Sequence, residues 1–203
     1  MNFRNIIFDA GSVLVNWNRY YLYTVVFGGD AERAAHFCKN VVTDEWNDVT
    51  DSGRPLGECL QQLYLQHPDA HTYISAYWNC YKDMDGGEVP GMYDLLLKLK
   101  EKGLHLFCLT NWSAETFPIV KEVNHRLFSF FEGIVVSGEE KIMKPDAGIY
   151  ELILKRYGLD RKESLFVDDR QKNVDGALAV GLPAERFIDA ENLKGRLEAL
   201  NVL

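Results

Sequence analysis

The segment RNIIFDAGSVL, residues 4–14, runs from an apolar stretch into a carboxylate and then into small residues. Its apolar part does not alternate with polar residues, which is typical of a β-strand buried on both faces of a sheet. Asp9 follows this strand directly. In open parallel sheets, ligands bind beyond the carboxyl ends of the strands. Asp9 is therefore the first candidate site residue, and the residues that follow the other strands become the next to examine.

Four more apolar runs of this kind follow along the chain. Between them lie segments in which apolar residues recur at helical spacing. These segments lead to Gly103, Gly158 and Gly181, a residue type that often follows the last turn of a helix. Strands that alternate with helices of about 10–15 residues indicate a parallel sheet with helices on both faces. The sequence therefore predicts an α/β fold with a doubly wound parallel sheet, whose strands are residues 4–8, 104–109, 133–136, 164–167 and 184–188.

Residues 15–88 interrupt this alternation. They contain no convincing buried strand, and they hold seven of the ten tyrosines and three of the four tryptophans. Aromatic residues with a polar group suit a surface that is partly packed and partly wet. We expect a helical cap over residues 15–88, and a Rossmann-like core made of residues 1–14 and 89–203. Helices that pack on the core without a role at the site are the alternative.

Polar side chains follow three further strands of the predicted sheet. Thr110 and Asn111 follow the second strand, Lys144 lies in the loop after the third, and Asp168 and Asp169 follow the fourth. Each of these residues alone is compatible with an ordinary turn, helix cap or surface loop. Together they deliver carboxylates, a hydroxyl, an amide and an ammonium group to one edge of the sheet. Carboxylates that lie close together repel one another unless a cation or proton intervenes, and Mg²⁺ prefers hard oxygen ligands.

Four motifs in this order resemble those of the haloacid dehalogenase (HAD) superfamily of hydrolases, over nearly the whole chain. They are FDAGSVL (8–14), LTN (109–111), MKPD (143–146) and FVDDRQKNV (166–174). Within the superfamily, the chain is most similar to a phosphatase branch that includes bacterial α-D-glucose-1-phosphate phosphatases and the N-terminal domain of soluble epoxide hydrolase. The resemblance implies a Mg²⁺-dependent phosphatase that works through an aspartyl-phosphate intermediate. It also implies a Rossmann-like core with the first strand between the second and the fourth, and an inserted cap.

The resemblance assigns roles to the candidate residues. Asp9 is expected to be the nucleophile and a metal ligand. The backbone carbonyl of Gly11 and the carboxylate of Asp169 would complete the protein ligands, with Asp168 in or near the metal shell. The expected phosphate-binding residues are Thr110, Asn111 and Lys144, of which Lys144 also steadies the ionised Asp9.

The first motif departs from the usual Asp-x-Asp-Gly pattern, because Gly11 stands in place of the second Asp and Ser12 in place of the Gly. That Asp normally protonates the leaving oxygen and later activates water. Its metal-binding group is a carbonyl, which Gly11 retains. We therefore expect substrates with stabilised leaving groups, such as anomeric sugar phosphates, acyl phosphates and aryl phosphates. Aromatic residues of the cap, with Trp17, Tyr20 and Trp46 as candidates, would contact a sugar ring unless they serve only in packing.

Two other functions stay open at this point. Haloacid dehalogenases also lack the second Asp, but they need no Mg²⁺ and lack the paired acids of the fourth motif, so this function is disfavoured. A protein that binds a phosphorylated ligand or a partner protein with little or no catalysis is the stronger alternative, since the usual acid is missing. Retention of Asp9, Lys144 and Asp169 together argues against it.

Composition excludes several classes of partner. The formal net charge is −8, with 22 basic and 30 acidic residues, and such a surface does not favour nucleic acid or anionic membranes. The expected partner is a small phosphorylated substrate, and the sequence indicates no oligomeric state. The four cysteines form no metal or disulfide pattern, and Met1–Phe8 does not resemble a secretory signal. These features predict a cytoplasmic protein.

Overall fold

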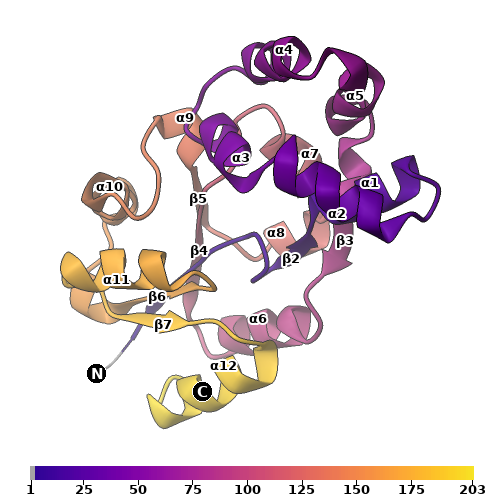
Figure 1. Cartoon of the computed structure of the whole chain (residues 1–203). Helices are drawn as coiled ribbons and strands as arrows, with labels where there is room; N and C mark the ends of the chain where they lie inside the picture. Colours follow the sequence, from indigo (N-terminus) through magenta and orange to yellow (C-terminus); the bar gives the residue numbers. More distant parts are fainter. Residues whose placement is uncertain (1–2) are drawn as a thin grey trace.

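The centre of the molecule is a sheet of five parallel strands in the order β5-β4-β1-β6-β7 (Figure 1). The computed structural model describes residues 3–203. The predicted doubly wound sheet is confirmed, and β1 lies between β4 and β6 as expected. The last strand ends two residues earlier than predicted. The strands are β1 (Asn5–Phe8), β4 (His105–Thr110), β5 (Gly133–Val136), β6 (Ser164–Asp168) and β7 (Ala184–Arg186).

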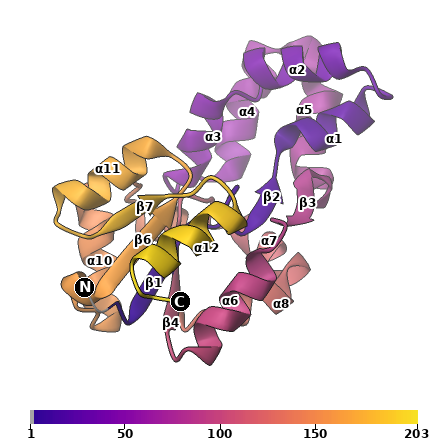
Figure 2. The same ribbon diagram turned by 90° about the horizontal axis from the view of Figure 1, so that it is seen from below.

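Helices cover both faces of this sheet (Figure 2). Successive side chains of a strand point to opposite faces, so Ile7 packs in one core and Ile6 and Phe8 pack in the other. The first core includes residues of α10 (Ala147–Tyr157) and α11 (Gln171–Ala179). The second core extends into the insert and includes α6 (Met92–Glu101), α7 (Phe117–Val123), α8 (His125–Phe128) and α12 (Ala190–Ala199). The short helices α9 (Ser137–Glu140) and η3 (Arg161–Glu163) complete this part of the chain.

The insert between β1 and α6 lies at one end of the sheet (Figures 1 and 2). It is mainly helical, as predicted. The aromatic residues of α1, α2 and α5 pack on one another, as in the contact between Tyr23 and Phe37. The helices are α1 (Arg19–Val26), α2 (Ala31–Asn40), α3 (Asp44–Asp51), α4 (Leu56–Gln66), η1 (Pro68–Ala70), α5 (His71–Asn79) and η2 (Tyr81–Met84).

Two short strands that the sequence analysis did not predict connect the insert to the core. β2 (Val15–Trp17) and β3 (Asp85–Glu88) form an antiparallel pair. No convincing buried strand was expected in residues 15–88, and both strands found there are short and only partly buried. β3 has the sequence DGGE, which carries no apolar signal. Gly86 is needed there, because a Cβ atom at this position would lie 2.8 Å from the Tyr21 ring.

Helix α3 was also missed. Its sequence, DEWNDVTD, is polar on nearly all sides, so it lacks the apolar periodicity by which the other helices were found. The signal that it does carry is a start signal. Thr43 precedes the helix and its hydroxyl accepts a hydrogen bond from the Trp46 N–H at 3.1 Å. Two acidic residues in the first turn, Asp44 and Glu45, are a further sign of a helix start.

Between residues 3 and 203, no helix combines the length and the apolar character needed to span a bilayer.

Candidate functional site

Three carboxylates meet at the carboxyl ends of β1 and β6. Asp9 follows β1, and Asp168 and Asp169 lie at and just beyond the end of β6. One oxygen from each of the three lies within 4.8 Å of the others. The two strands are direct neighbours in the sheet, which explains why residues about 160 positions apart converge. The sequence analysis expected this cluster.

Lys144 lies beneath the cluster and holds two of its members. Its Nζ lies 2.9 Å from Oδ1 of Asp9 and 2.7 Å from Oδ2 of Asp168, and it donates a third hydrogen bond to the Leu109 carbonyl at 2.8 Å. A lysine ammonium has three N–H donors, so all of them are used. The side chain is completely buried. In this arrangement Lys144 faces the carboxylates and not open space.

The charges of this group are strongly coupled. The pKa of Asp9 is raised to about 7: burial is the main cause, Lys144 opposes the rise, and Asp168 adds to it. Burial also raises the pKa of Asp169, and the neighbouring Asp168 raises it further. Burial alone would lower the pKa of Lys144, but Asp168 and Asp9 raise it above its ordinary value.

One carboxylate oxygen of Asp9 accepts hydrogen bonds, and the other has none within the described part of the chain. Its Oδ1 accepts hydrogen bonds from the Ala10 N–H at 2.7 Å and from Lys144. Its Oδ2 has no hydrogen-bond partner among residues 3–203. Asp168 is more fully engaged, because it also accepts hydrogen bonds from the Arg170 N–H and from the Asn173 side chain. Of these two buried carboxylates, Asp9 therefore has the free oxygen.

Thr110, the last residue of β4, and Asn111, which follows it, behave differently from each other. The hydroxyl oxygen of Thr110 is buried and has no hydrogen-bond partner among the described residues. Asn111 instead uses its side chain to hold the backbone of Lys144. Its Nδ2 donates to the Lys144 carbonyl at 2.9 Å, and its Oδ1 accepts from the Lys144 N–H at 2.8 Å. One amide N–H of Asn111 is left for a ligand.

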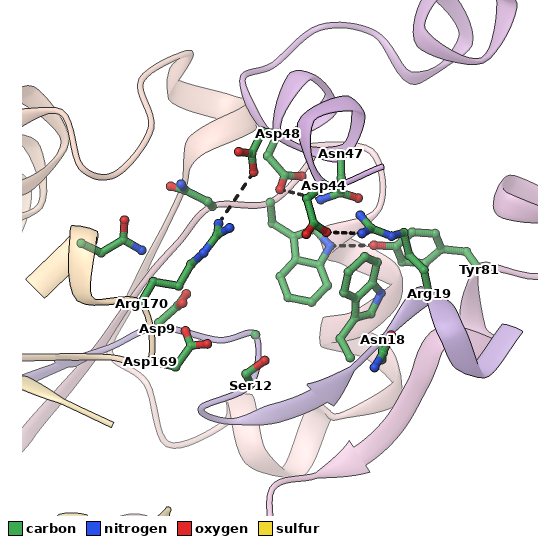
Figure 3. A pocket seen from close by; sticks show the side chains of 16 residues that line it. Asp9, Ser12, Asn18, Arg19, Asp44, Asn47, Asp48, Tyr81, Asp169 and Arg170 are labelled. Atoms are coloured by element: carbon green, nitrogen blue, oxygen red, sulfur yellow. Dashed lines mark hydrogen bonds and ion pairs between the residues drawn. The ribbon is translucent and has the colours of Figure 1, made fainter. Parts of the chain in front are cut away.

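A cavity of about 250 Å³ lies between this edge of the sheet and the insert. Figure 3 shows Asp9, Asp169 and Arg170 on the core side of the cavity, facing residues of α1 and α3. Asp48 of α3 pairs with Arg170 across it at 3.7 Å, and Asp44 pairs with Arg19. The other lining residues are Gly11, Ser12, Trp17, Asn18, Asn47, Asp51, Tyr81, Asn111, Trp112 and Asn173.

Of the three aromatic residues expected at this cavity, one lines it and two do not. Trp17 lines it, and its ring packs edge-on against Trp112. Tyr20 and Trp46 do not line it. The Tyr20 hydroxyl donates a hydrogen bond to the Ala31 carbonyl, and the indole N–H of Trp46 donates to the Cys59 carbonyl. These two residues stabilise the insert itself, so their expected role at the site is wrong.

The sequence analysis missed the polar residues that the insert contributes to the cavity. Most of them, including Asn47, Asp48 and Asp51, lie on α3, the helix that it did not predict. Their common signal is the spacing of three and four residues, which places them on one side of a helix. That signal becomes visible only after Thr43 is recognised as a helix cap.

The loop at position 11 leaves room in the cavity wall. Ser12 has a φ of 60°, an uncommon value for a residue with a side chain. A Cβ atom added at Gly11 would lie 3.4 Å from Cζ3 of Trp112, an ordinary van der Waals contact. Gly11 itself offers no side chain to a ligand.

The donor set fits a divalent metal ion. Three ionised carboxylates and one ammonium group leave two uncompensated negative charges in a largely buried site. Burial is the main cause of the raised pKa of Asp9, and the neighbouring carboxylates Asp168 and Asp169 add to it. A hard divalent cation with carboxylate ligands would compensate the two negative charges. The site therefore combines a free carboxylate oxygen, an anionic cluster suited to a cation, and an unpartnered buried hydroxyl.

Residues 3–181 match the family model of the haloacid dehalogenase-like hydrolases. Over 191 residues the chain is 29% identical to the sesquiterpene phosphatase astK of Aspergillus oryzae, covering 93% of this chain and 91% of that protein. Over 97 residues it is 36% identical to an (S)-2-haloacid dehalogenase of Pseudomonas sp., covering 47% of this chain and 40% of that one. A HAD family enzyme of Bacteroides thetaiotaomicron, solved as a magnesium complex, shares the fold. Its TM-score is 0.76 at 21% identity, with 97% of this chain and 99% of that one covered.

Proposed function

This chain belongs to the haloacid dehalogenase-like hydrolases, and we propose that it is a Mg²⁺-dependent phosphatase of a small phosphorylated metabolite. The favoured substrate class is a sugar phosphate. We further propose that Asp9 attacks phosphorus to form an aspartyl-phosphate, and that residues 15–88 act as the cap over this site. The sesquiterpene phosphatase of Aspergillus oryzae, similar over nearly its whole length, supports the reaction class.

One observation carries the proposal, namely the free Oδ2 of Asp9 beside two more carboxylates. Lys144 holds Asp9 by its other oxygen, which favours the ionised form of the carboxylate and fixes its direction. A positioned carboxylate of this kind is a suitable nucleophile for a phosphoryl group. The unpartnered hydroxyl of Thr110 is a donor for a phosphoryl oxygen, and it gains a partner only when a ligand binds.

Asp9, the Gly11 carbonyl, Asp169 and Asp168 are the proposed metal-binding residues. When bound, Mg²⁺ supplies positive charge that offsets the negative charge of the phosphoryl group. Asn111 positions Lys144 through two hydrogen bonds to its backbone, and its remaining amide N–H is available to the phosphate. Lys144 acts on the phosphate through its charge and through Asp9, because its three donors are engaged.

The cavity walls support a polyhydroxylated substrate over an apolar one. Trp17 and Trp112 offer an aromatic surface, and Asn18 and Asn47 offer hydrogen-bonding groups. An apolar chain would desolvate the amide N–H groups of these residues that are not used within the protein, which is unfavourable. A sugar ring satisfies both kinds of surface. For this reason we do not expect this chain to share the substrate of the Aspergillus phosphatase.

Dehalogenation is the second candidate, because the chain is also similar to an (S)-2-haloacid dehalogenase over about half its length. The acidic pair Asp168-Asp169 disfavours it. A haloacid carries its own carboxylate, and placing it beside three others that share the Lys144 ammonium, without a metal ion, would be repulsive. A non-catalytic ligand-binding protein is the third candidate, and Gly11, which lacks a carboxylate, favours it.

A substrate panel separates these candidates. Purified protein with Mg²⁺ is incubated with p-nitrophenyl phosphate, anomeric sugar phosphates, sugar phosphates on primary alcohols and alkyl phosphates, each with and without EDTA. Our proposal predicts phosphate release that EDTA removes and excess Mg²⁺ restores, with sugar phosphates among the best substrates. Release of chloride from a 2-haloacid without Mg²⁺ would establish the second candidate. Absence of any turnover together with phosphate binding would establish the third.

A further inference from the structure

The cavity contains a buried acid that the proposed function does not use. When a phosphate ester is cleaved, the leaving oxygen takes up negative charge, and a positioned acid that protonates it speeds the step. Gly11 has no side chain for this task. Five aspartates line the cavity, and four of them are otherwise engaged. Asp9 and Asp169 belong to the acidic cluster, while Asp44 and Asp48 each pair with an arginine. The fifth is Asp51.

Asp51 is buried and forms no ion pair with any residue between 3 and 203. It is 7% exposed. The Asn47 amide donates a hydrogen bond to its Oδ2 at 2.9 Å, and the Thr50 hydroxyl lies 3.3 Å from its Oδ1. Its hydrogen-bond contacts, which include one with the Ser113 backbone, are therefore to neutral groups. A carboxyl group in such surroundings is held in its neutral form.

The charged and titratable groups around Asp51 agree with this. The pKa of Asp51 is raised to about 8. Burial is the main cause and Asp48 adds to it, whereas Thr50, the Ser113 backbone and Arg19 act in the opposite direction. The two tyrosines that face it are Tyr77 of α5 and Tyr81 of η2, and burial raises the pKa of each above its ordinary value. Both tyrosines therefore stay neutral at the pH at which Asp51 changes its charge.

Asp51 is also fixed relative to the core. Its carbonyl accepts a hydrogen bond from the Ser137 hydroxyl at 2.6 Å. Just beyond α3, Gly53 lies so close to the core that a Cβ atom there would stand 2.7 Å from the Gly138 carbonyl. The first N–H of α4, at Leu56, donates to Glu115 of the core at 2.6 Å. This end of α3 is thus attached on several sides, and Asp51 reaches the cavity without any movement of the insert.

We propose that Asp51 is the general acid and base of the phosphatase reaction, the role for which Gly11 offers no carboxylate. The inference rests on the proposed function. As Oδ2 of Asp9 bonds to phosphorus, the bond between phosphorus and the leaving oxygen breaks. The bonding electron pair stays on that oxygen, and the Asp51 proton moves to it to release the alcohol. Asp51 is now a carboxylate and takes a proton from the water that attacks phosphorus. The bond between phosphorus and Asp9 then breaks, which frees phosphate and restores both carboxyl groups.

The test is the leaving-group dependence of Asp51→Asn. The variant and the wild type are compared on p-nitrophenyl phosphate, whose leaving group needs little protonation, and on phenyl phosphate, whose leaving group needs more. We expect kcat/KM for phenyl phosphate to fall by about 10²- to 10⁴-fold and that for p-nitrophenyl phosphate to change much less. The matched control is Asp44→Asn, which removes another acid from the same helix and cavity. It is expected to change both substrates by the same factor.

The pH profile gives a second readout. With phenyl phosphate, kcat/KM of the wild type should fall as the pH rises through about 8, and Asp51→Asn should lack this fall. Asp51→Glu, which keeps an acid, should recover part of the activity on phenyl phosphate. If Asp51→Asn does not fold, the wild-type profiles on the two substrates and Asp51→Glu decide the matter.

Equal losses on both substrates, or none, would overturn the assignment of Asp51 while leaving the proposed function intact. So would a wild-type profile with phenyl phosphate that stays flat above pH 8. Failure of the proposed function looks different, because the wild type would then release no phosphate even from p-nitrophenyl phosphate. That result would overturn both.

Discussion

The buried ammonium group of Lys144 lies 2.9 Å from Oδ1 of Asp9, and the same nitrogen lies 2.7 Å from Oδ2 of Asp168. One cation thus holds two carboxylates at the carboxyl ends of two neighbouring strands. Because the contact uses Oδ1, the other oxygen of Asp9 is left without a partner among residues 3–203. The pair favours the ionised form of a buried carboxylate and orients it in one direction.

Replacement of this lysine should damage the fold as well as the site. In Lys144→Met, two buried carboxylates lose the only cationic partner that they have among residues 3–203, and breaking a buried pair in this way costs about 3–5 kcal/mol. We expect a loss of this order in the free energy of unfolding, measured by urea denaturation. Lys155→Met, at an exposed position, is the control and should change little. A Lys144→Met protein as stable as the wild type would contradict the importance given to the pair.

Thr110 should affect activity without affecting stability. Its hydroxyl has no partner in the described chain, so Thr110→Val removes no hydrogen bond from the folded protein. If the hydroxyl binds the phosphoryl group, the loss is about 1–3 kcal/mol, or roughly 5- to 150-fold in kcat/KM. Thr110→Ser keeps the hydroxyl and should retain most of the activity. The assignment is wrong if Thr110→Val turns over substrate at the wild-type rate.

Mg²⁺ should stabilise the folded protein in the absence of substrate. A ligand that binds only the folded state adds about 2.7 kcal/mol at 100 times its dissociation constant, and here it also relieves repulsion among three carboxylates. Differential scanning calorimetry should therefore show a Tm that rises with Mg²⁺ concentration. Asp169→Asn should remove most of this rise, and Asp69→Asn, at an exposed position, should not. An identical rise in wild type and Asp169→Asn would place the metal elsewhere.

Asp51 should make stability depend on pH. Its pKa of about 8 in the folded protein is above the ordinary value of 3.8, so between these values the folded state holds a proton that the unfolded state has released. Stability then falls as the pH rises through this range. Asp51→Asn has no such proton, and its stability relative to wild type should increase between pH 5 and pH 9 by an amount on the order of a few kcal/mol.

Urea denaturation at several pH values measures this difference. Asp69→Asn, which removes an exposed acid, serves as the comparison and should follow the wild-type curve. Parallel curves for wild type and Asp51→Asn would mean that Asp51 is already ionised at neutral pH.

The sheet was predictable from the sequence because its strands are buried on both faces. Residues such as Ile6, Ile7 and Phe8 are apolar without interruption for that reason. The convergence of Asp9 and Asp168 was predictable too, since the carboxyl ends of neighbouring parallel strands meet at one edge. These features depend on local pattern and on the topology of the sheet.

The cavity wall contributed by the insert was not predictable in the same way. Helix α3 has no apolar stripe, because one side faces the cavity and its end is attached to the core by polar contacts such as Ser137 with Asp51. Tyr20 and Trp46 were wrongly expected at the cavity, since an aromatic residue at helical spacing gives the same signal whether it packs inward or lines a site. Only the packing of the insert distinguishes these cases.

The central claim is that the carboxylate of Asp9 carries out Mg²⁺-dependent phosphoryl transfer. The most direct measurement compares steady-state phosphate release from p-nitrophenyl phosphate by the wild type and by Asp9→Asn, each with Mg²⁺ and with EDTA. The amide that this substitution introduces has nearly the same shape as the carboxylate but cannot act as the nucleophile. We predict turnover by the wild type with Mg²⁺ only, and almost none by Asp9→Asn under either condition. Turnover by a folded Asp9→Asn protein at a rate near that of the wild type would contradict the claim.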